Sequence, residues 1–277
     1  MVPELSVPRR IYRRWMRLIA RALRASFRDD ISTAAAGVTF YALLAFFPVV
    51  GAFVSLYGLF ADIKTAREHL AYLGGFLPDG VLTFVGDEMV RAATTHPSKL
   101  GIAFAVGLLL SITSANAGVQ ALISGINVAY AQKETRGFIR YNLRSLAITL
   151  VSLGIFLVAF MLLIVLPAVP WQFGPNLLRW PLLWAGLTAA LMAIYRYGPN
   201  RGKQHGRCVM PGSFVAASLW LLASLIFTWY VSNFAQYDRT YGSLGAMVGF
   251  MMWIWIGQWV VLFGAELNAE VEQKCSR

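Results

Sequence analysis

Two long apolar runs near the C-terminal end constrain the fold of this chain more than any other feature. They cover residues 211–234 and 243–264, and only a short Tyr- and Gly-containing connector, residues 235–242, separates them. Each run reaches or exceeds the roughly 20 residues that an α-helix needs to cross a hydrocarbon core about 30 Å thick. The pair therefore predicts a helical hairpin that spans a membrane.

The composition extends this interpretation to the whole chain. Of the 277 residues, 58% are hydrophobic and only 13% are charged, far less charge than a soluble domain usually carries. Further apolar stretches lie at residues 34–60, 100–122, 143–166 and 181–197. The sequence therefore predicts an all-α, integral membrane, six-helix transmembrane bundle over residues 31–270, with a short tail at 271–277. The two cysteines, Cys208 and Cys275, are expected to be free thiols.

Residues 1–30 form a separate Arg-rich segment with an amphipathic pattern. Apolar side chains, among them Leu18, Ala22, Leu23 and Phe27, fill the faces left between the arginines. Such a helix is expected to lie in the headgroup plane and to bind anionic phospholipids at the cytoplasmic face. A nucleic-acid-binding arm is the alternative, but interleaved aromatic residues suit a membrane surface better, so no nucleic acid is expected as a partner. The arginines recur at helical spacing: Arg10, Arg13, Arg14, Arg17, Arg21, Arg24 and Arg28.

The distribution of Lys and Arg predicts the orientation of the spans. Basic residues concentrate in the N-terminal segment, in the loops after the second and fourth predicted spans, and in the tail. By the positive-inside rule both termini then lie in the cytoplasm. Orientation and lipid anchoring thus account for the net charge of +11.

A stripe of polar residues on the second predicted span is the first candidate site. Amides in hydrocarbon are costly unless they are paired or hydrated, so the stripe should face the bundle interior. Two interpretations stay open: hydrogen bonds between helices, or the lining of a polar cavity. On the fifth span Ser224 and Thr228 would line the facing wall, although small hydroxyls there are more often packing devices. The stripe consists of Thr113, Asn116, Gln120, Ser124 and Asn127, whose spacing places them on one helical face.

The start of the sixth span is a second candidate. Free backbone N–H groups at a helix start favour an anion, and a cationic side chain lies just before them. The alternative is a turn followed by close helix packing through glycine. The residues concerned are Arg239, Tyr241, Gly242 and Gly245.

Further positions are candidates for structural or gating roles. Asp29 and Asp30 predict a helix start, and Pro48 predicts a kink in the first span, with a hinge as the alternative. Gln258 lies within the sixth span, and Glu266 and Asn268 lie at its cytoplasmic end.

Glu266 stands at a helix C-terminus, where a carboxylate is unfavourable, so it should have a cationic partner. A structural ion pair and a role in gating or proton coupling both stay open. The candidate partners are Arg28, Arg140, Arg144 and Arg196.

Several segments together resemble the YihY/BrkB family. They read TFYALLAFFPVV (39–50), YRYGPN (195–200), MPGSFVAASLW (210–220), SNFAQYDRTYGSLGAMVGFMMWIW (232–255) and GAELNAE (264–270). The resemblance implies a multi-pass, six-helix protein of the bacterial cytoplasmic (inner) membrane. The family once carried the label ribonuclease BN, but the chain has no His-x-His or paired-carboxylate motif for metal-dependent phosphodiester hydrolysis. No enzymatic activity, metal or cofactor is therefore expected.

These observations favour a protein that moves an anionic lipid or amphiphile, as a transporter or flippase does. The supporting features are the basic cytoplasmic rim, the polar stripes and the proline in the first span. The alternative is a membrane scaffold that organises partners and contributes to envelope integrity without transport. The sequence leaves the cargo open, and it leaves a homo-oligomer open as well.

Overall fold

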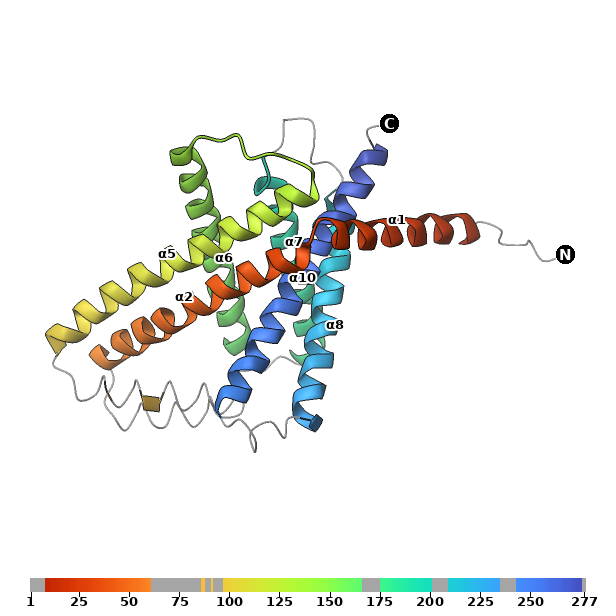
Figure 1. Cartoon of the computed structure of the whole chain (residues 1–277). Helices are drawn as coiled ribbons and strands as arrows, with labels where there is room; N and C mark the ends of the chain where they lie inside the picture. Colours follow the sequence, from red (N-terminus) through yellow and green to blue (C-terminus); the bar gives the residue numbers. More distant parts are fainter. Residues whose placement is uncertain are drawn as a thin grey trace. The chain divides into compact units, whose positions relative to one another are not determined.

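The computed structural model describes residues 8–60, 86–87, 91, 97–165, 175–200, 209–234 and 243–275. Seven helices and no strand occur among them, so the all-α prediction is confirmed for this part of the chain (Figure 1). The helices are α1 (Pro8–Arg28), α2 (Ile31–Phe60), α5 (Pro97–Ala129), α6 (Phe138–Val165), α7 (Pro175–Tyr197), α8 (Met210–Phe234) and α10 (Ser243–Cys275).

Four of these helices are long and apolar enough to cross a membrane. The qualifying stretches are Ile31–Ala52 in α2, Gly101–Ala129 in α5, Met210–Tyr230 in α8 and Val248–Gln273 in α10. Helices α6 and α7 cover the third and fourth predicted spans, but neither qualifies on the residues that the structure describes. The chain is therefore a multi-pass helical membrane protein with at least four candidate spans.

A two-residue turn, Asp29–Asp30, joins α1 to α2. The Asp29 amide donates to the Ala25 carbonyl at 2.8 Å, and the Thr33 amide donates to the Asp30 carbonyl at 3.1 Å. Asp30 has φ 48°, in the left-handed region that Asp tolerates better than most L-residues. The predicted helix start at this pair is thus observed, because one helix ends and the next begins there.

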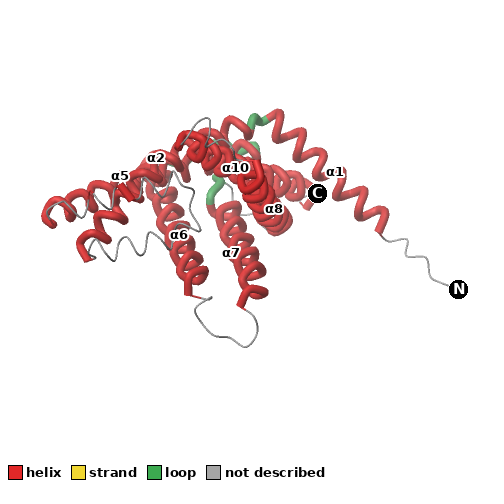
Figure 2. The backbone as a smooth tube through the Cα atoms, turned by 90° about the horizontal axis from the view of Figure 1, so that it is seen from below, coloured by secondary structure: helices red, strands yellow, loops and turns green. Residues whose placement is uncertain are grey.

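The chain divides into two compact units, which are described separately. Unit 1 comprises Met1–Ala36, Val119–Ala223 and Ile256–Arg277, and unit 2 comprises Gly37–Gly118 and Ser224–Trp255. Helices α2, α5, α8 and α10 contribute residues to both units. Helices α6 and α7 belong to unit 1 and lie side by side (Figure 2).

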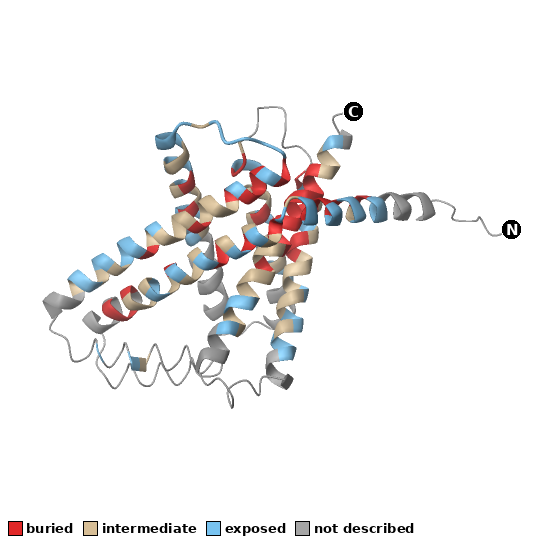
Figure 3. Cartoon of the chain, in the orientation of Figure 1, coloured by how far each residue is buried: buried red, intermediate tan, exposed pale blue. Residues whose placement is uncertain are grey.

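The core of unit 1 is the second half of α10. Every residue from position 260 to 269 is buried, and Leu262, Ala265 and Leu267 have no exposed surface at all (Figure 3). A helix segment that is buried on all faces needs neighbours on all sides. Ala216 and Ala217 of α8, Tyr195 of α7 and Ile126 of α5 are buried to the same degree.

Close approach between α8 and α10 depends on small residues. A Cβ atom on Gly264 would lie 2.6 Å from the Ala216 Cβ and 2.6 Å from the Tyr195 hydroxyl oxygen, so only glycine fits. The Gly212 amide donates to Asn268 Oδ1 at 2.7 Å, and the Tyr195 hydroxyl donates to the Val261 carbonyl at 2.5 Å. Small residues allow helix backbones in membranes to approach closely, and here they also admit two polar contacts.

The two helices of this pair are antiparallel. In unit 1, Gly212 faces Gly264, and a Cβ on Gly257 would lie 2.7 Å from Trp220 Nε1. In unit 2, Trp253 Nε1 donates to Ser224 Oγ at 3.1 Å. Within unit 1, contacts further along α8 involve earlier residues of α10. The two apolar runs therefore lie in antiparallel helices, as the predicted hairpin requires, and its connector, residues 235–242, lies outside the described residues.

In unit 2, α2 and α5 meet through glycines. A Cβ on Gly107 would lie 3.2 Å from the Pro48 carbonyl oxygen and 3.3 Å from the Ala52 Cβ. A Cβ on Gly118 would lie 3.4 Å from the Tyr41 Cβ, so these helices are also antiparallel. Pro48 lies inside α2, which continues to Phe60. The predicted kink or hinge at Pro48 stays a prediction, and the observed role of this residue is contact with α5.

We expect Gly264→Ala to destabilise the protein by about 1–3 kcal/mol, because the added methyl group overpacks the contact with Ala216 and Tyr195. Gly186→Ala on α7 is the matched control, since a Cβ at Gly186 meets nothing within 4 Å. The control should leave stability unchanged or raise it slightly, because alanine favours helix. Thermal unfolding in detergent measures both changes, and equal stability of the two variants would contradict the proposed packing.

Candidate functional site

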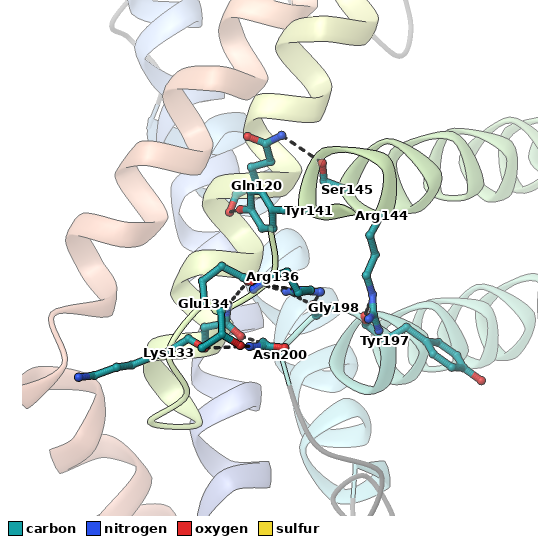
Figure 4. A network of polar contacts seen from close by, with 12 residues as sticks. Gln120, Lys133, Glu134, Arg136, Tyr141, Arg144, Ser145, Tyr197, Gly198 and Asn200 are labelled. Atoms are coloured by element: carbon teal, nitrogen blue, oxygen red, sulfur yellow. Dashed lines mark hydrogen bonds and ion pairs between the residues drawn. The ribbon is translucent and has the colours of Figure 1, made fainter. Parts of the chain in front are cut away.

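Gln120 of the polar stripe bonds to α6. Its Nε2 donates to Asn142 Oδ1 at 2.8 Å and lies 3.1 Å from Ser145 Oγ, and the Tyr141 hydroxyl donates to the Gln120 carbonyl at 3.2 Å (Figure 4). The side chain amide thus has partners on a neighbouring helix. At this position the structure matches the first of the two interpretations, a hydrogen bond between helices.

Asn127, the last residue of the stripe, is buried at the end of α5 and connects two loops. Its Nδ2 donates to Glu134 Oε2 at 3.0 Å, and its Oδ1 accepts from the Asn200 amide at 2.8 Å. Asn200 Nδ2 in turn donates to the Lys133 carbonyl at 2.9 Å and to Thr135 Oγ1 at 2.8 Å. Two asparagines therefore tie the loop after α5 to the segment after α7.

An ion pair completes this network (Figure 4). Arg136 Nη2 lies 2.5 Å from Glu134 Oε2, and both Arg136 Nη atoms lie 3.2 Å from the Gly198 carbonyl oxygen. Arg144 Nε of α6 donates to the Tyr197 carbonyl at 2.9 Å. The hydrogen bond from Arg136 lowers the pKa of Glu134. The contacts hold the α5–α6 loop against the end of α7.

The three other residues of the stripe on α5, Thr113, Asn116 and Ser124, differ in exposure. Thr113 is exposed, and its hydroxyl donates to the carbonyls of Leu109 and Leu110 on its own helix. Ser124 is also exposed, and Asn116 is half-buried. The cavity lining stays a prediction, because Gln120 and Asn127 bond to different partners and the Thr113 hydroxyl bonds within its own helix.

The hydroxyl groups of Ser224 and Thr228 on α8 form hydrogen bonds of the kind that accompany helix packing. Ser224 Oγ accepts from Trp253 Nε1, and the Thr228 hydroxyl donates to the Ser224 carbonyl at 2.8 Å.

The predicted anion site cannot be built from the described residues. Arg239, Tyr241 and Gly242 lie outside the part of the chain that the structure describes. Gly245 lies in the first turn of α10, which begins at Ser243. The anion site therefore stays a prediction.

Helix α10 carries buried polar atoms that lack a hydrogen-bond partner among the described residues. They include Gln258 Oε1, Glu266 Oε1 and Asn268 Nδ2. Asn268 uses its other amide atom, Oδ1, to accept from Gly212. Such orphaned atoms are rare in folded proteins and call for an explanation.

The expected ion pair of Glu266 is not observed in this part of the chain. Arg28 acts on Glu266 electrostatically, but its guanidinium donates two hydrogen bonds to Asp29, at 2.8 and 3.0 Å. Arg144, another expected partner, bonds to the Tyr197 carbonyl instead. The sequence did not predict this outcome, because it does not show that Arg28 bonds to the neighbouring Asp29 and not to Glu266.

The described side chains of α1, from Trp15 onward, divide among three faces. One face is buried and includes Leu18, Ala22 and Ala25. A second exposes apolar side chains, of which Phe27 is 80% exposed. The third carries the exposed arginines 17, 21, 24 and 28. The sequence assigned Leu18 and Ala22 to a membrane-facing surface, whereas the structure buries them against protein.

Helix α1 is linked to α10 by a weak ion pair. Arg21 Nη1 lies 3.9 Å from Glu270 Oε2. The small side chains Ala22, Ala25 and Ser26 on the buried face permit close packing, because none of them extends far from the helix axis. The apolar face formed by Met16, Leu23 and Phe27 is thereby left uncovered beside the arginines.

Among the described residues, no group of three or more His, Cys, Asp or Glu could hold a metal ion. The three histidines, His69, His96 and His205, lie outside these residues. Sequence reasoning did not single out Glu134 or Asn200 as site residues. The signal that could have found them is the presence of Asn, Arg and Glu in the loops after the second and fourth predicted spans. Both loops are predicted to lie on the same side of the membrane.

The fold and the contacts define a multi-pass helical membrane protein in which the core of unit 1 lies around α10. Comparison with known proteins identifies its family. The family described as "Virulence factor BrkB" matches residues 22–277, and the chain belongs to it.

Curated relatives agree with this assignment. The chain is 27% identical to the ribonuclease-like protein YfkH of Bacillus subtilis, over 86% of this chain and 89% of that protein. It is 26% identical to a UPF0761 membrane protein of Acinetobacter baylyi, over 92% of this chain but only 62% of the longer relative. A UPF0761 membrane protein of Pseudoalteromonas atlantica is 23% identical over 88% of this chain and 82% of the relative. No solved structure matches the chain.

We expect Ala131→Gly to stabilise the protein by about 1 kcal/mol or less, because Ala131, in the turn that follows α5, has φ 50° and glycine adopts this conformation without strain. The Gln132 amide, which donates to the Asn127 carbonyl at 2.8 Å, should be unaffected. Ala129→Gly, at the last residue of the same helix, is the control and should destabilise the protein, because glycine favours helix less than alanine does. Changes of the same sign in thermal unfolding would contradict the assignment of a left-handed cap.

The Glu134–Arg136 pair should make stability depend on pH. A carboxyl whose pKa is lower in the folded state stabilises the fold above its unfolded pKa, and this stability is lost as the pH falls through the folded pKa. We expect the unfolding temperature of the wild type to fall below about pH 4.3, the ordinary value for Glu. The change should be about 1 kcal/mol or less, because the pair is partly exposed. Glu134→Gln should show a shallower acid dependence, and an unchanged profile in that variant would rule the pair out as its cause.

Proposed function

We propose that this protein moves an anionic lipid or a related amphiphile across or within the bacterial cytoplasmic membrane. The observation that carries the proposal is a set of buried atoms on α10 without a hydrogen-bond partner among the described residues: Gln258 Oε1, Glu266 Oε1 and Asn268 Nδ2. Each such atom costs about 1–3 kcal/mol of stability when it is left unsatisfied. Polar and ionisable groups inside membrane helices are typical of substrate and ion pathways. A protein that only spans the membrane has no use for them.

The arginines of α1 support an anionic cargo. Four of them, Arg17, Arg21, Arg24 and Arg28, are exposed beside the uncovered apolar face that includes Leu23 and Phe27. A helix with an arginine face beside an apolar face suits the headgroup region. There the apolar side chains enter the acyl boundary and the arginines contact phosphate groups. In the proposal α1 lies at the cytoplasmic surface of the membrane and gathers anionic lipid there.

The proposal includes six spans with both termini in the cytoplasm. Helices α6 and α7 supply the third and fourth spans. The connection between α5 and α6 contains Lys133 and Arg136, and Arg140 lies in the first turn of α6, which suits a cytoplasmic loop. The network around Asn127 and Asn200 would then close the cytoplasmic end of the bundle.

We also propose that the chain is not an enzyme, although the name of the Bacillus subtilis relative includes the word ribonuclease. Metal-dependent phosphodiester hydrolysis needs clustered histidine or carboxylate ligands in reach of water. The sequence contains no such motif, and its charged residues fit topology and lipid binding. Chelator-sensitive cleavage of RNA by the purified protein would contradict this proposal.

A non-transporting membrane scaffold is the second candidate. Gln120 and Asn127, two of the polar groups that would line a cavity, are engaged in hydrogen bonds to Asn142, Ser145, Glu134 and Asn200. This observation favours a polar stripe that holds helices together. A scaffold needs a rigid bundle and a charged surface but no path through the membrane.

Lipid exchange in proteoliposomes separates the two candidates. We expect the protein to accelerate transbilayer movement of fluorescent phosphatidylglycerol over empty vesicles, and to act less on matched fluorescent phosphatidylcholine. Gln258→Leu and Asn116→Leu should slow exchange, and the combined Arg17→Gln and Arg24→Gln variant should reduce the preference for the anionic lipid. Exchange equal to that of empty vesicles for both lipids would refute the transport proposal and leave the scaffold.

A further inference from the structure

We propose that Arg140, Arg144 and Arg196, at the adjoining ends of α6 and α7, bind the phosphate group of an anionic phospholipid whose acyl chains lie along the exposed side of α6. We call these three residues the α6–α7 arginine cluster. All three belong to unit 1, and none of them belongs to the arginine face of α1. A bound lipid at this position requires no lipid movement, so the inference does not rest on the proposed function.

The end of α7 holds Arg144 in place. Arg144 Nε donates to the carbonyl of Tyr197, the last residue of α7, at 2.9 Å (Figure 4). The last carbonyl groups of a helix and its dipole both attract a cation. The bond engages Nε alone, and Nη1 and Nη2 have no acceptor in the described part of the chain. A guanidinium that is fixed in this way can donate to phosphate oxygens from its free terminal nitrogens.

Two further arginines accompany Arg144. Arg140 lies one helical turn before it on α6 and therefore on the same side of that helix. Arg196 directly precedes Tyr197 on α7, and its guanidinium carbon lies 5.8 Å from the centre of the Tyr197 ring. All three arginines are exposed. The two neighbouring helices thus carry three accessible cations at the same end.

The arginine cluster has no acidic partner in the described part of the chain. Glu134 is the only Asp or Glu between residues 119 and 223, and it forms its ion pair with Arg136, outside the cluster. No ion pair of the described residues includes a member of the cluster. Cations one helical turn apart repel each other, and an anion bound beside them offsets this repulsion. The missing negative charge must therefore come from a ligand.

The same side of α6 becomes apolar beyond the arginines. Leu143, Leu150 and Val151 are each more than half exposed, and their helical spacing places them beside and below the cluster. The opposite side of the helix, which includes Ser145 and Thr149, is buried against protein. Basic side chains at the end of a membrane helix bind phospholipid headgroups, and the apolar strip provides a surface for the acyl chains.

An anionic phospholipid satisfies both parts of this surface. A soluble phosphate or a nucleic acid would neutralise the arginines but would leave the apolar strip without a cover. A zwitterionic phospholipid would cover the strip, but it carries a cation of its own that opposes the arginines. In phosphatidylglycerol the charge of the phosphate is not balanced within the molecule. The ligand is therefore a lipid of this anionic class.

Photo-crosslinking of the full-length protein in phosphatidylcholine vesicles tests the site. The probes are phosphatidylglycerol and phosphatidylcholine that carry the same diazirine group in one acyl chain. Peptide mass spectrometry should show several-fold more labelling of residues 143–151 by the phosphatidylglycerol probe than by the phosphatidylcholine probe. Equal labelling by the two probes would overturn the proposal.

Removal of the cations should remove this preference. The combined Arg140→Gln and Arg144→Gln variant should be labelled equally by both probes. The combined Arg17→Gln and Arg24→Gln variant on α1 loses the same charge and should keep the preference at residues 143–151. A preference that survives in the first variant, or that disappears to the same extent in the second, would contradict binding at the cluster.

Arg140→Gln alone is the variant to use if the combined variant does not fold, because it keeps the bond from Arg144 to Tyr197. It should weaken the preference for phosphatidylglycerol. Lys133→Gln is its matched control, since Lys133 is an exposed cation in the loop before α6. The control should leave the preference unchanged, and equal effects of the two substitutions would mean that overall charge selects the lipid.

Soluble glycerol 3-phosphate separates a lipid from a free phosphate as the ligand. An excess of it should leave the labelling by the phosphatidylglycerol probe unchanged, because it lacks the acyl chains that contact α6. Displacement of the probe would show that a phosphate group binds without acyl chains, and it would overturn the assignment to a lipid. Crosslinking reports binding whether or not a lipid crosses the membrane, so its result is independent of the transport assay.

Discussion

The close approach of α8 to α10 is the contact on which the remainder of unit 1 depends. Gly212, Ala216 and Gly264 bring the two backbones together, and the Tyr195 hydroxyl reaches the Val261 carbonyl in the space that Gly264 leaves. In a membrane there is no hydrophobic force to draw apolar helices together, so packing of small residues and hydrogen bonds must do so. The burial of residues 260–269 on all faces requires this contact on one side of α10. Glu266 and Asn268 are buried for the same reason, although both are polar.

Two kinds of polar group are found in the bundle, and they differ in how their hydrogen bonds are satisfied. The groups at the ends of α5, α6 and α7 bond to one another, as Asn127, Glu134 and Asn200 show. Gln258, Glu266 and Asn268 on α10 each leave an atom without a hydrogen-bond partner in the part of the chain that the structure describes. A satisfied network makes a structure rigid, whereas an unsatisfied buried group is a liability unless it binds something. The distinction separates the residues that hold the bundle together from those that are candidates for function.

Long apolar segments made most of the fold predictable from the sequence. The hairpin of α8 and α10, the all-α architecture and the turn at Asp29 and Asp30 follow from hydropathy and helix-end signals. Hydrogen-bond partners were not predictable, because Gln120 and Asn127 look alike in a helical stripe whether they face water or Asn142 and Asn200. The capture of Arg28 by Asp29 also depends on a turn geometry with φ 48° at Asp30, which spacing alone does not specify. The division of α1 among three faces required knowledge of what it packs against.

The ten consecutive buried residues of α10 have a consequence for the length of this helix. One inserted residue turns the rest of an α-helix by about 100° and moves it by about 1.5 Å. A helix with one solvent-facing side can absorb such a change by rotation, but residues 260–269 have no side that can be exposed. An insertion here would carry Gly264 away from Ala216 and bring a side chain into its place. Related chains should therefore vary in the length of their loops and keep this segment free of insertions and deletions.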